Sequence, residues 1–323
     1  MTQQNFIERR SGFWNEFEKV INGNKKIVKS RAAWFPPAWR EITQDLNTAR
    51  SHAFDPSIIE RLNRLVLEGN QLLYGQRSWS IKIIIDFITK TFPRAIRSQW
   101  RGLGAASLIF WGLALFFGFL CVRFPAAVYE FIPESQAVQM EEMYNPESYH
   151  FLHPRDVGGD ADMFGYYIYN NVAIAFRTFA GGILAGFGSL LILCFNGAFM
   201  GVIAAHIINQ GFSEPFFSFV IGHGSFELTA IVLSAQAGLL LGYSFFVTKG
   251  RSRAASIRAA GKTALPLITG STIMLVIAAV IEAFWSSRHQ TPSNIRFIAG
   301  GAGWILLYSY FIFAGREKKE KKR

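Results

Sequence analysis

Polar side chains interrupt a long apolar stretch of the sequence, residues 172–247, and these are the residues that could do chemistry. His223 and Glu227 are four residues apart, so a helix would carry both on one face. Arg177 is expected at a similar depth on a neighbouring helix, which predicts an ion pair between Arg177 and Glu227. The polar side chains expected to share one buried pocket are Asn170, Asn171, Arg177, Asn196, His206, His223 and Glu227.

Two kinds of chemistry fit this pocket. In the first, it is a functional site for a metal ion, a proton or a substrate, since a histidine and a glutamate at this spacing can bind zinc. In the second, the ion pair is a structural clamp that holds a broken helix in place. We expect the clamp, with no metal and no cofactor, because His206 is the one obvious third ligand. Glu282 lies at the outer end of a later apolar run, where its carboxylate can extend to the membrane surface, and it is assigned no role.

The composition argues against a water-soluble enzyme and against a disordered chain. Of 323 residues, 50% are hydrophobic and 17% are charged, whereas about a quarter of a soluble domain is charged. Residues 1–101 carry 17 Lys and Arg against 9 Asp and Glu, while residues 123–171 carry 2 against 8. Because the basic blocks flank apolar runs, the basic charge indicates membrane topology and not nucleic-acid binding.

Apolar runs of about 20 residues can cross a bilayer as helices. The sequence predicts an all-α polytopic membrane protein whose transmembrane domain covers residues 101–315. Its six expected spans are 102–122, 171–194, 197–210 together with a half-helix at 216–222, 225–247, 265–284 and 297–313. The stretch 197–210 would rise only about 21 Å, less than the hydrocarbon core of about 30 Å. We therefore expect a broken span, with 216–222 re-entering from the outer face.

Charge also predicts the orientation. Lys and Arg concentrate in cytoplasmic segments, so we expect the basic loop 249–262, the tail 316–323 and the N-terminal region to be cytoplasmic. The acidic loop 123–170 then lies outside. This arrangement places both termini in the cytoplasm.

The first hundred residues, 1–100, are predicted to form three or four cytoplasmic amphipathic helices, because apolar residues recur there at helical spacing. Residues 81–96 are apolar on one side and basic on the other, which favours an elbow helix on the cytoplasmic leaflet. A small soluble bundle without lipid contact is the alternative. Likewise, the basic tail either binds anionic lipid or serves only to set the topology.

Three pairs of glycines at a spacing of four residues occur inside the apolar runs. Such pairs let helix backbones approach closely. Packing within the chain and formation of a homodimer both fit them. The pairs are Gly182 with Gly186, Gly197 with Gly201, and Gly238 with Gly242.

Three motifs in order resemble the stage II sporulation protein M family. They are a paired-Asn start with a Gly-rich helix over 170–189, an Asn-Gly element over 196–201, and Gly-His-Gly-Ser-Phe-Glu-Leu over 222–228. The resemblance is strong over 170–250 and looser in the flanking spans. One departure is Gly222, where the family usually has proline. The long N-terminal region resembles the broader, non-sporulating branch.

The resemblance implies a multi-pass protein of the inner (cytoplasmic) membrane without known catalysis. It also implies a scaffold for an envelope-associated assembly such as a peptidoglycan-remodelling complex. It also implies a MoxR-type ATPase or envelope proteins as partners, beside the membrane lipids and a second copy of the chain. A transporter or channel that uses the Arg/Glu/His pocket is the alternative function. An intramembrane metal-dependent hydrolase is a third, less favoured class, so no catalytic residues are expected.

Overall fold

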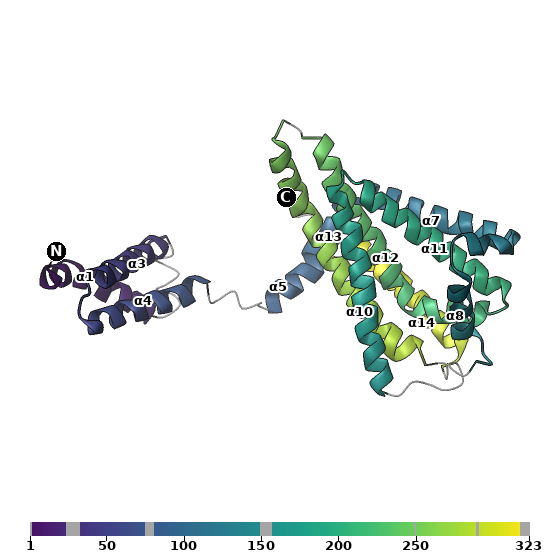
Figure 1. Ribbon diagram of the computed structural model, residues 1–323, viewed down its shortest axis with the longest axis horizontal. Coiled ribbons are helices and arrows are strands. Elements are labelled where there is room, and N and C mark those ends of the chain that lie inside the picture. The colour runs from purple at the N-terminus through teal and green to yellow at the C-terminus, as the bar shows by residue number, and fades with distance from the viewer. Residues whose placement is uncertain are drawn as a thin grey trace, which may run out of the picture. The chain divides into compact units, whose positions relative to one another are not determined.

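The chain is described by a computed structural model for residues 2–23, 33–74, 81–148, 157–248, 250–288 and 291–316. These residues contain helices and no strands, which confirms the predicted all-α class. They form two compact units, Met1–Ile84 and Ile85–Arg323 (Figure 1). The boundary thus lies before residue 100, because most of the expected elbow helix belongs to the second unit.

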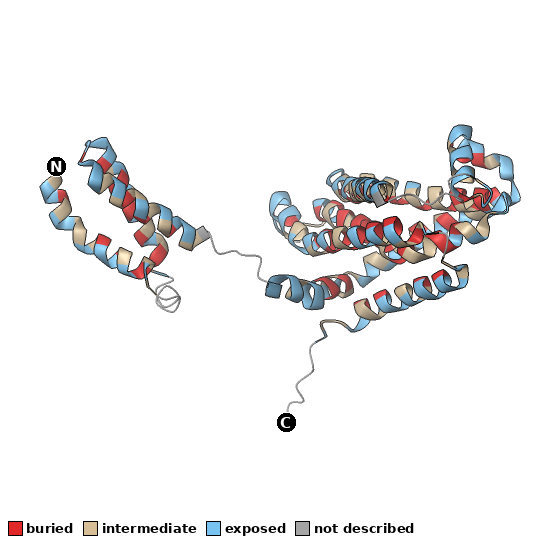
Figure 2. Ribbon diagram, turned by 90° about the horizontal axis from the view of Figure 1, so that it is seen from below, coloured by how far each residue is buried: buried red, intermediate tan, exposed pale blue. Residues whose placement is uncertain are grey.

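The described residues of the N-terminal unit include three long helices: α1 (Gln3–Ile21), α3 (Phe35–Ser51) and α4 (Pro56–Tyr74). Their apolar faces meet in one core, which includes the fully buried Phe17, Ile42 and Leu62. Figure 2 shows buried residues along one side of each helix and exposed residues along the other. Amphipathic spacing is therefore sufficient to explain this unit.

The second unit is a bundle of long helices around α12. It comprises α7 (Trp100–Arg123), α10 (Val157–Ala180), α11 (Phe187–Asn209), α12 (Ser213–Phe246), α13 (Arg253–Ile281), extended by the π-helical turn η4 (Glu282–Ser286), and α14 (Ser293–Phe313). Among the described residues, α7, α11, α12, α13 with η4, and α14 are long and apolar enough to cross a membrane. The more polar α10 packs lengthwise against α12 and α13.

The expected broken span is wrong. All but the last residue of 197–210 belongs to the uninterrupted α11. The half-helix 216–222 and all but the last residue of the span 225–247 belong to the uninterrupted α12. Asn196 does not break its helix because its side chain donates to the carbonyl of Ile192, 2.8 Å away. Pro215 lies in the first turn of α12, where proline needs no hydrogen-bond partner for its nitrogen.

The chain reverses instead at residues 181–186, so the expected span 171–194 is also wrong. The 3₁₀ turn η3 (Gly181–Ile183) ends α10, and Ala185 and Gly186 follow with positive φ angles of 54° and 86°. Left-handed backbone of this kind ends helices and allows a tight hairpin. A hairpin of α10 and α11 results.

The glycine pairs pack against other helices of the same chain. A Cβ atom on Gly182 would overlap the backbone of Gly238, and one on Gly242 would overlap that of Gly186. In the same way, Gly201 lies against the backbone of Ala114 on α7. These pairs therefore bring α12 close to the α10–α11 hairpin, and α7 close to α11. Because the glycine pairs are used within the chain, a homodimer would have to form through another surface.

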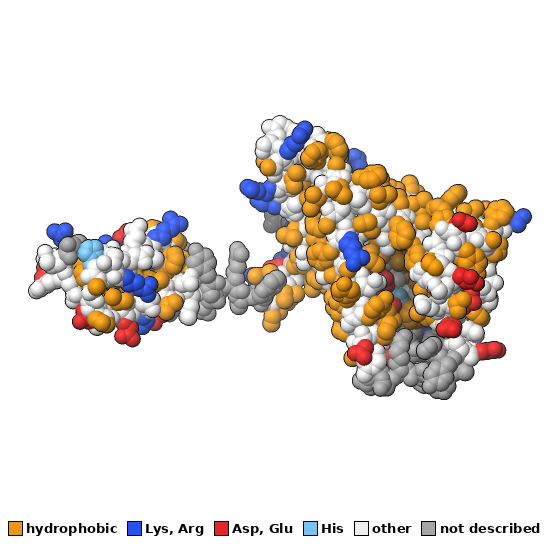
Figure 3. All heavy atoms as spheres, in the orientation of Figure 1, with side chains coloured by type: hydrophobic (Ala, Val, Ile, Leu, Met, Phe, Trp, Pro, Cys, Tyr) orange, Lys and Arg blue, Asp and Glu red, His pale blue; other side chains and the backbone are white. Residues whose placement is uncertain are grey.

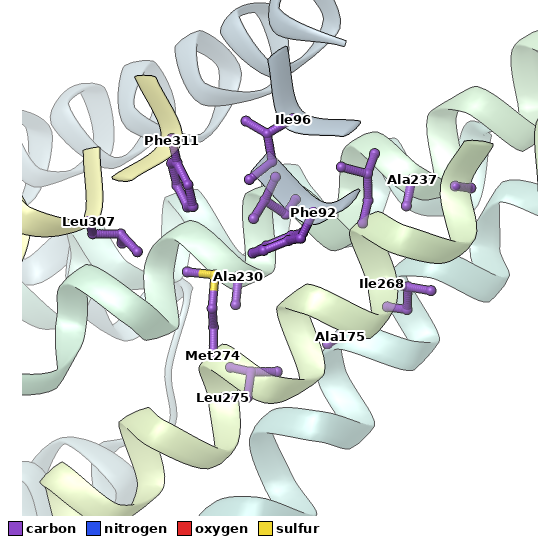
Figure 4. Packing of buried hydrophobic residues seen from close by; sticks show 13 residues of the cluster. Phe92, Ile96, Ala175, Ala230, Ala237, Ile268, Met274, Leu275, Leu307 and Phe311 are labelled. Carbon is purple, nitrogen blue, oxygen red and sulfur yellow. The ribbon is translucent and has the colours of Figure 1, made fainter. Parts of the chain in front are cut away.

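The elbow segment consists of α5 (Ile81–Asp86), the π-helical turn η1 (Phe87–Thr91) and α6 (Phe92–Ser98). Phe92 and Ile96 are buried against α13 and α14, in the cluster shown in Figure 4. Arg97 donates to the carbonyl of Phe311 at 2.7 Å. Five isoleucines before Phe92 are exposed: Ile81, Ile83, Ile84, Ile85 and Ile88. The predicted contact of the elbow helix with lipid would use these side chains.

The segment between α7 and α10 includes the 3₁₀ turn η2 (Pro125–Glu130) and α8 (Glu134–Tyr144), which contact α11. Tyr144 packs edge-on against Phe216 and Phe219 at the start of α12, with ring centroids 5.1 and 5.9 Å apart. Acidic side chains gather over α8 and the start of α10, whereas basic ones mark the α12–α13 loop (Figure 3). The separation of charge read from the sequence is thus visible on the surface.

Candidate functional site

His223 and Glu227 form the centre of the site, on one face of α12. The Nε2 atom of His223 lies 3.6 Å from Oε2 of Glu227. The histidine is 4% exposed, and 20% of the Glu227 side chain is exposed. The predicted sharing of a helical face therefore brings these two groups together.

The π-helical turn η4 supplies two further polar groups. Ser286 Oγ lies 3.2 Å from His223 Nδ1. One ligand atom each from His223, Glu227 and Glu282 can be chosen such that all three lie within 4.8 Å of one another. Gly222 permits this approach, because a Cβ atom there would meet the Ser286 hydroxyl at 2.8 Å. A π-helical turn widens the helix by one residue per turn, and such turns are frequent at functional sites.

Sequence reasoning missed Glu282. An acidic residue inside an apolar run was a signal of a functional role, but its place at the end of the run suggested a carboxylate that extends to the membrane surface. The structure instead buries Glu282, with 8% exposed. The π-turn that points it at α12 follows from packing and has no simple sequence pattern.

A cavity of about 240 Å³ adjoins the cluster. Its polar lining comprises Asn170, Asn171, Asn196, His223, Glu227 and Glu282, with Tyr144 from α8. Phe110 and Ile231 also line it. They belong to an apolar cluster completed by Ala106, Leu193, Val232 and Ala235.

Arg177 does not join this pocket, and the predicted pair with Glu227 is wrong. The prediction began the helix at Asn171, whereas α10 begins at Val157, so Arg177 falls in the last turn of α10. There it is exposed, and no ion pair within the described residues includes it. A cation in this position is favoured by the partial negative charge of a helix C-terminus.

His206 is part of a different cluster. Its Nε2 lies 2.8 Å from Glu141 Oε1 on α8, and Gln210 donates to the same oxygen at 2.9 Å. The aromatic ring of Tyr129 lies nearby, with a centroid distance of 6.2 Å. This group ties η2 and α8 to the end of α11. Glu141 is thus a second partner that sequence reasoning did not identify.

The chain carries two family matches. The sequence profile of stage II sporulation protein M matches residues 107–287, more than half of the chain, from α7 through η4. The chain belongs to the stage II sporulation protein M family. A domain of unknown function, DUF8413, matches residues 4–75, which correspond to α1, α3 and α4.

A relative in Methanocaldococcus jannaschii, described as an uncharacterized protein, is 30% identical over 127 residues. The match covers 38% of this chain and 70% of that relative. No solved structure matches the chain. The family match spans the whole His223–Glu227–Glu282 cluster and, with the apolar helices, identifies a membrane protein.

Proposed function

We propose that this protein is a non-enzymatic scaffold in the cytoplasmic membrane for an envelope-associated assembly, such as one that remodels peptidoglycan. The observation that carries this proposal is the division of the chain into two units with separate hydrophobic cores, each matched by its own family. The bundle would anchor the chain, and the N-terminal unit would hold cytoplasmic partners. A MoxR-type ATPase is the first partner to test.

The topology that we propose has six crossings, with α10 as the sixth. Its support is geometric, because α10 packs along the length of the bundle. Near its beginning, the ring of Phe164 lies against that of Phe284 in η4, with the two ring centroids 5.7 Å apart. At its other end, the hairpin after α10 packs against Gly238 of α12. Six crossings return both termini to the cytoplasm, and they place the basic α12–α13 loop on the same side of the membrane. The acidic segment with η2 and α8 then lies outside, where it could contact envelope partners or a second copy.

Transport is the competing function, and the polar cavity is the observation that favours it. A transporter needs a polar route onward from the cavity to the cytoplasmic side. The apolar cluster of Phe110, Leu193 and Ile231 lies next to the cavity along α12. Beyond it, Gln236 packs at Gly102 on α7. This packing supports a static bundle over a transport path.

Crosslinking in native membranes tests the scaffold. The full chain carries a photoreactive residue at an exposed position of α4 or, as the matched control, of α8, and a variant that lacks residues 2–75 carries the α8 residue alone. We expect an ATPase to be crosslinked through α4 of the full chain, and the crosslinks through α8 to be the same in the full chain and in the shortened variant. Absence of an ATPase from the α4 crosslinks, or solute flux in proteoliposomes that Glu227→Gln abolishes, would reject the scaffold.

A further inference from the structure

One donor atom each from His223, Glu227 and Glu282 lies within 4.8 Å of the other two, so the three side chains are close enough together to hold one metal ion after small adjustments. In a tetrahedral zinc site with bonds of about 2.0–2.1 Å, neighbouring ligand atoms lie about 3.3 Å apart. The 3.6 Å between His223 Nε2 and Glu227 Oε2 is close to this value. It is also longer than a good hydrogen bond, which is compatible with one ion bound by both atoms.

The imidazole of His223 is already oriented as a metal ligand. Ser286 hydrogen-bonds Nδ1 at 3.2 Å, and this leaves Nε2 facing Glu227. Histidine ligands commonly bond a second group through their other ring nitrogen, which fixes the ring orientation and the tautomer. Ser286 is therefore a positioning residue for His223.

Charge favours a cation at the same place. Among the ion pairs of the described residues, Glu227 has only His223 as a partner. The described residues that line the cavity include no Lys or Arg. Buried carboxylates in apolar surroundings are usually paired or coordinate metals, and a divalent cation would offset the charge of Glu227. The cavity is large enough for water ligands, which occupy about 30 Å³ each in the liquid.

We propose that His223, Glu227 and Glu282 bind a divalent transition-metal ion, with zinc as the best match to one nitrogen and two carboxylate donors. The ion joins α12 to the π-helical end of α13 and so cross-links the bundle beside the cavity. This inference stands independently of the scaffold function.

Metal content tests the site directly. The full chain is purified in detergent through a tag without histidine, and its metals are measured by mass spectrometry. After removal of metal with a chelator, Zn²⁺ is added back in competition with a chelating dye. We expect about one Zn²⁺ per chain at saturation and at least a tenfold loss of affinity in Glu282→Gln and in His223→Ala. Ser286→Ala should weaken binding about 10–100-fold.

Glu141→Gln is the matched control, because Glu141 contacts the buried His206 in the same chain but belongs to no group of three ligands in the described residues. Its Zn²⁺ affinity should equal that of the wild type. Co²⁺ added to the metal-free wild type should give the absorption bands of a low-symmetry site, a test that needs no variant to fold. Equal Zn²⁺ binding by the wild type and Glu282→Gln, or a Co²⁺ spectrum of the hydrated ion, would overturn the proposal.

Discussion

At the scale of single residues, the position of an ionisable side chain along its helix decides whether it can reach a partner in the bundle. Arg177 and Glu227 illustrate this, because both are ionisable residues in helices of the bundle and only Glu227 is turned toward a partner. Arg177 lies one turn from the end of α10, where its guanidinium remains exposed.

Arg177→Gln should change the free energy of unfolding by less than about 0.5 kcal/mol, as for other exposed sites. Glu227→Gln should change it more, because Glu227 contacts His223. The double variant should show the sum of the two effects, since distant residues without shared partners act independently. Thermal unfolding in detergent measures all three. Recovery of stability in the double variant would mean that the two side chains do meet.

Ala185→Gly should stabilise the α10–α11 hairpin. Ala185 has a φ of 54°, and left-handed backbone costs a residue with a Cβ atom about 1–2 kcal/mol. Glycine loses more entropy on folding, by about 0.4–1 kcal/mol, so the net gain should lie between zero and about 1.6 kcal/mol. A rise in Tm checks this, and Ala173→Gly, inside α10, is the control that should lower Tm.

At the scale of helices, close backbone contact holds the bundle together. Gly201→Ala would force a Cβ atom into the backbone of Ala114 and should destabilise by about 1–3 kcal/mol, as overpacked sites do. Gly112→Ala is the control on the facing helix, because nothing lies within 4 Å of its Cβ position. Unfolding in detergent measures the stability of both variants, and only Gly201→Ala should be less stable than the wild type. Equal losses of stability in the two variants would show that the α7–α11 contact is looser than described.

The N-terminal unit is held by surface charges as well as by its core. Arg61 donates to Glu18 at 2.7 Å, and this hydrogen bond lowers the pKa of Glu18 below its ordinary value of 4.5. A lowered pKa stabilises the fold in full above the unfolded value and loses this effect as the pH falls through the folded value. For a partly exposed pair the effect is about 0.2–1 kcal/mol.

We therefore expect residues 2–75 to fold as a separate fragment, with the wild type more stable than Glu18→Gln at neutral pH. The difference should shrink as the pH falls below 4.5. Thermal unfolding followed by circular dichroism at several pH values gives this difference directly. A difference that is constant across the acid range would contradict the proposed role of the ion pair.

Much of the helical order could be predicted from the sequence, and its limits have a physical cause. Arg101 and Arg123 bound an uncharged run, so α7 was predicted to within a few residues. The break predicted between 210 and 216 is close to the real turn between α11 and α12. The breaks predicted near Asn196-Gly197 and between 222 and 225 were wrong, because polar and glycine residues at these positions are accommodated inside α11 and α12. The pairing of His223 with Glu227 follows from helical spacing, whereas Glu282 reaches them through a π-turn that only packing creates.

At the scale of the whole molecule, the direction of the chain through the membrane can be tested with single cysteines after Cys121 and Cys194 are replaced. Glu142→Cys should react with an impermeant thiol reagent added to the outside of intact cells, and Arg253→Cys should not. Leu184→Cys, at the exposed tip of the hairpin, tests the sixth crossing. It should be protected outside and labelled after permeabilisation. Labelling of Leu184→Cys from outside would remove α10 from the set of crossings.

The length of α12 links the site to the thickness of the lipid bilayer. Its 34 residues rise about 51 Å at 1.5 Å per residue, whereas a hydrocarbon core measures about 30 Å. In the proposed topology the Phe246 end lies at the cytoplasmic interface, so about 20 residues would fill the core and the helix would leave it near Glu227. The His223–Glu227–Glu282 cluster then lies at the outer boundary, where lipid headgroups meet the acyl chains. Bilayer thickness would therefore set the surroundings of the cluster. A thicker bilayer would immerse the cluster in lipid, and a thinner one would expose it to water and ions.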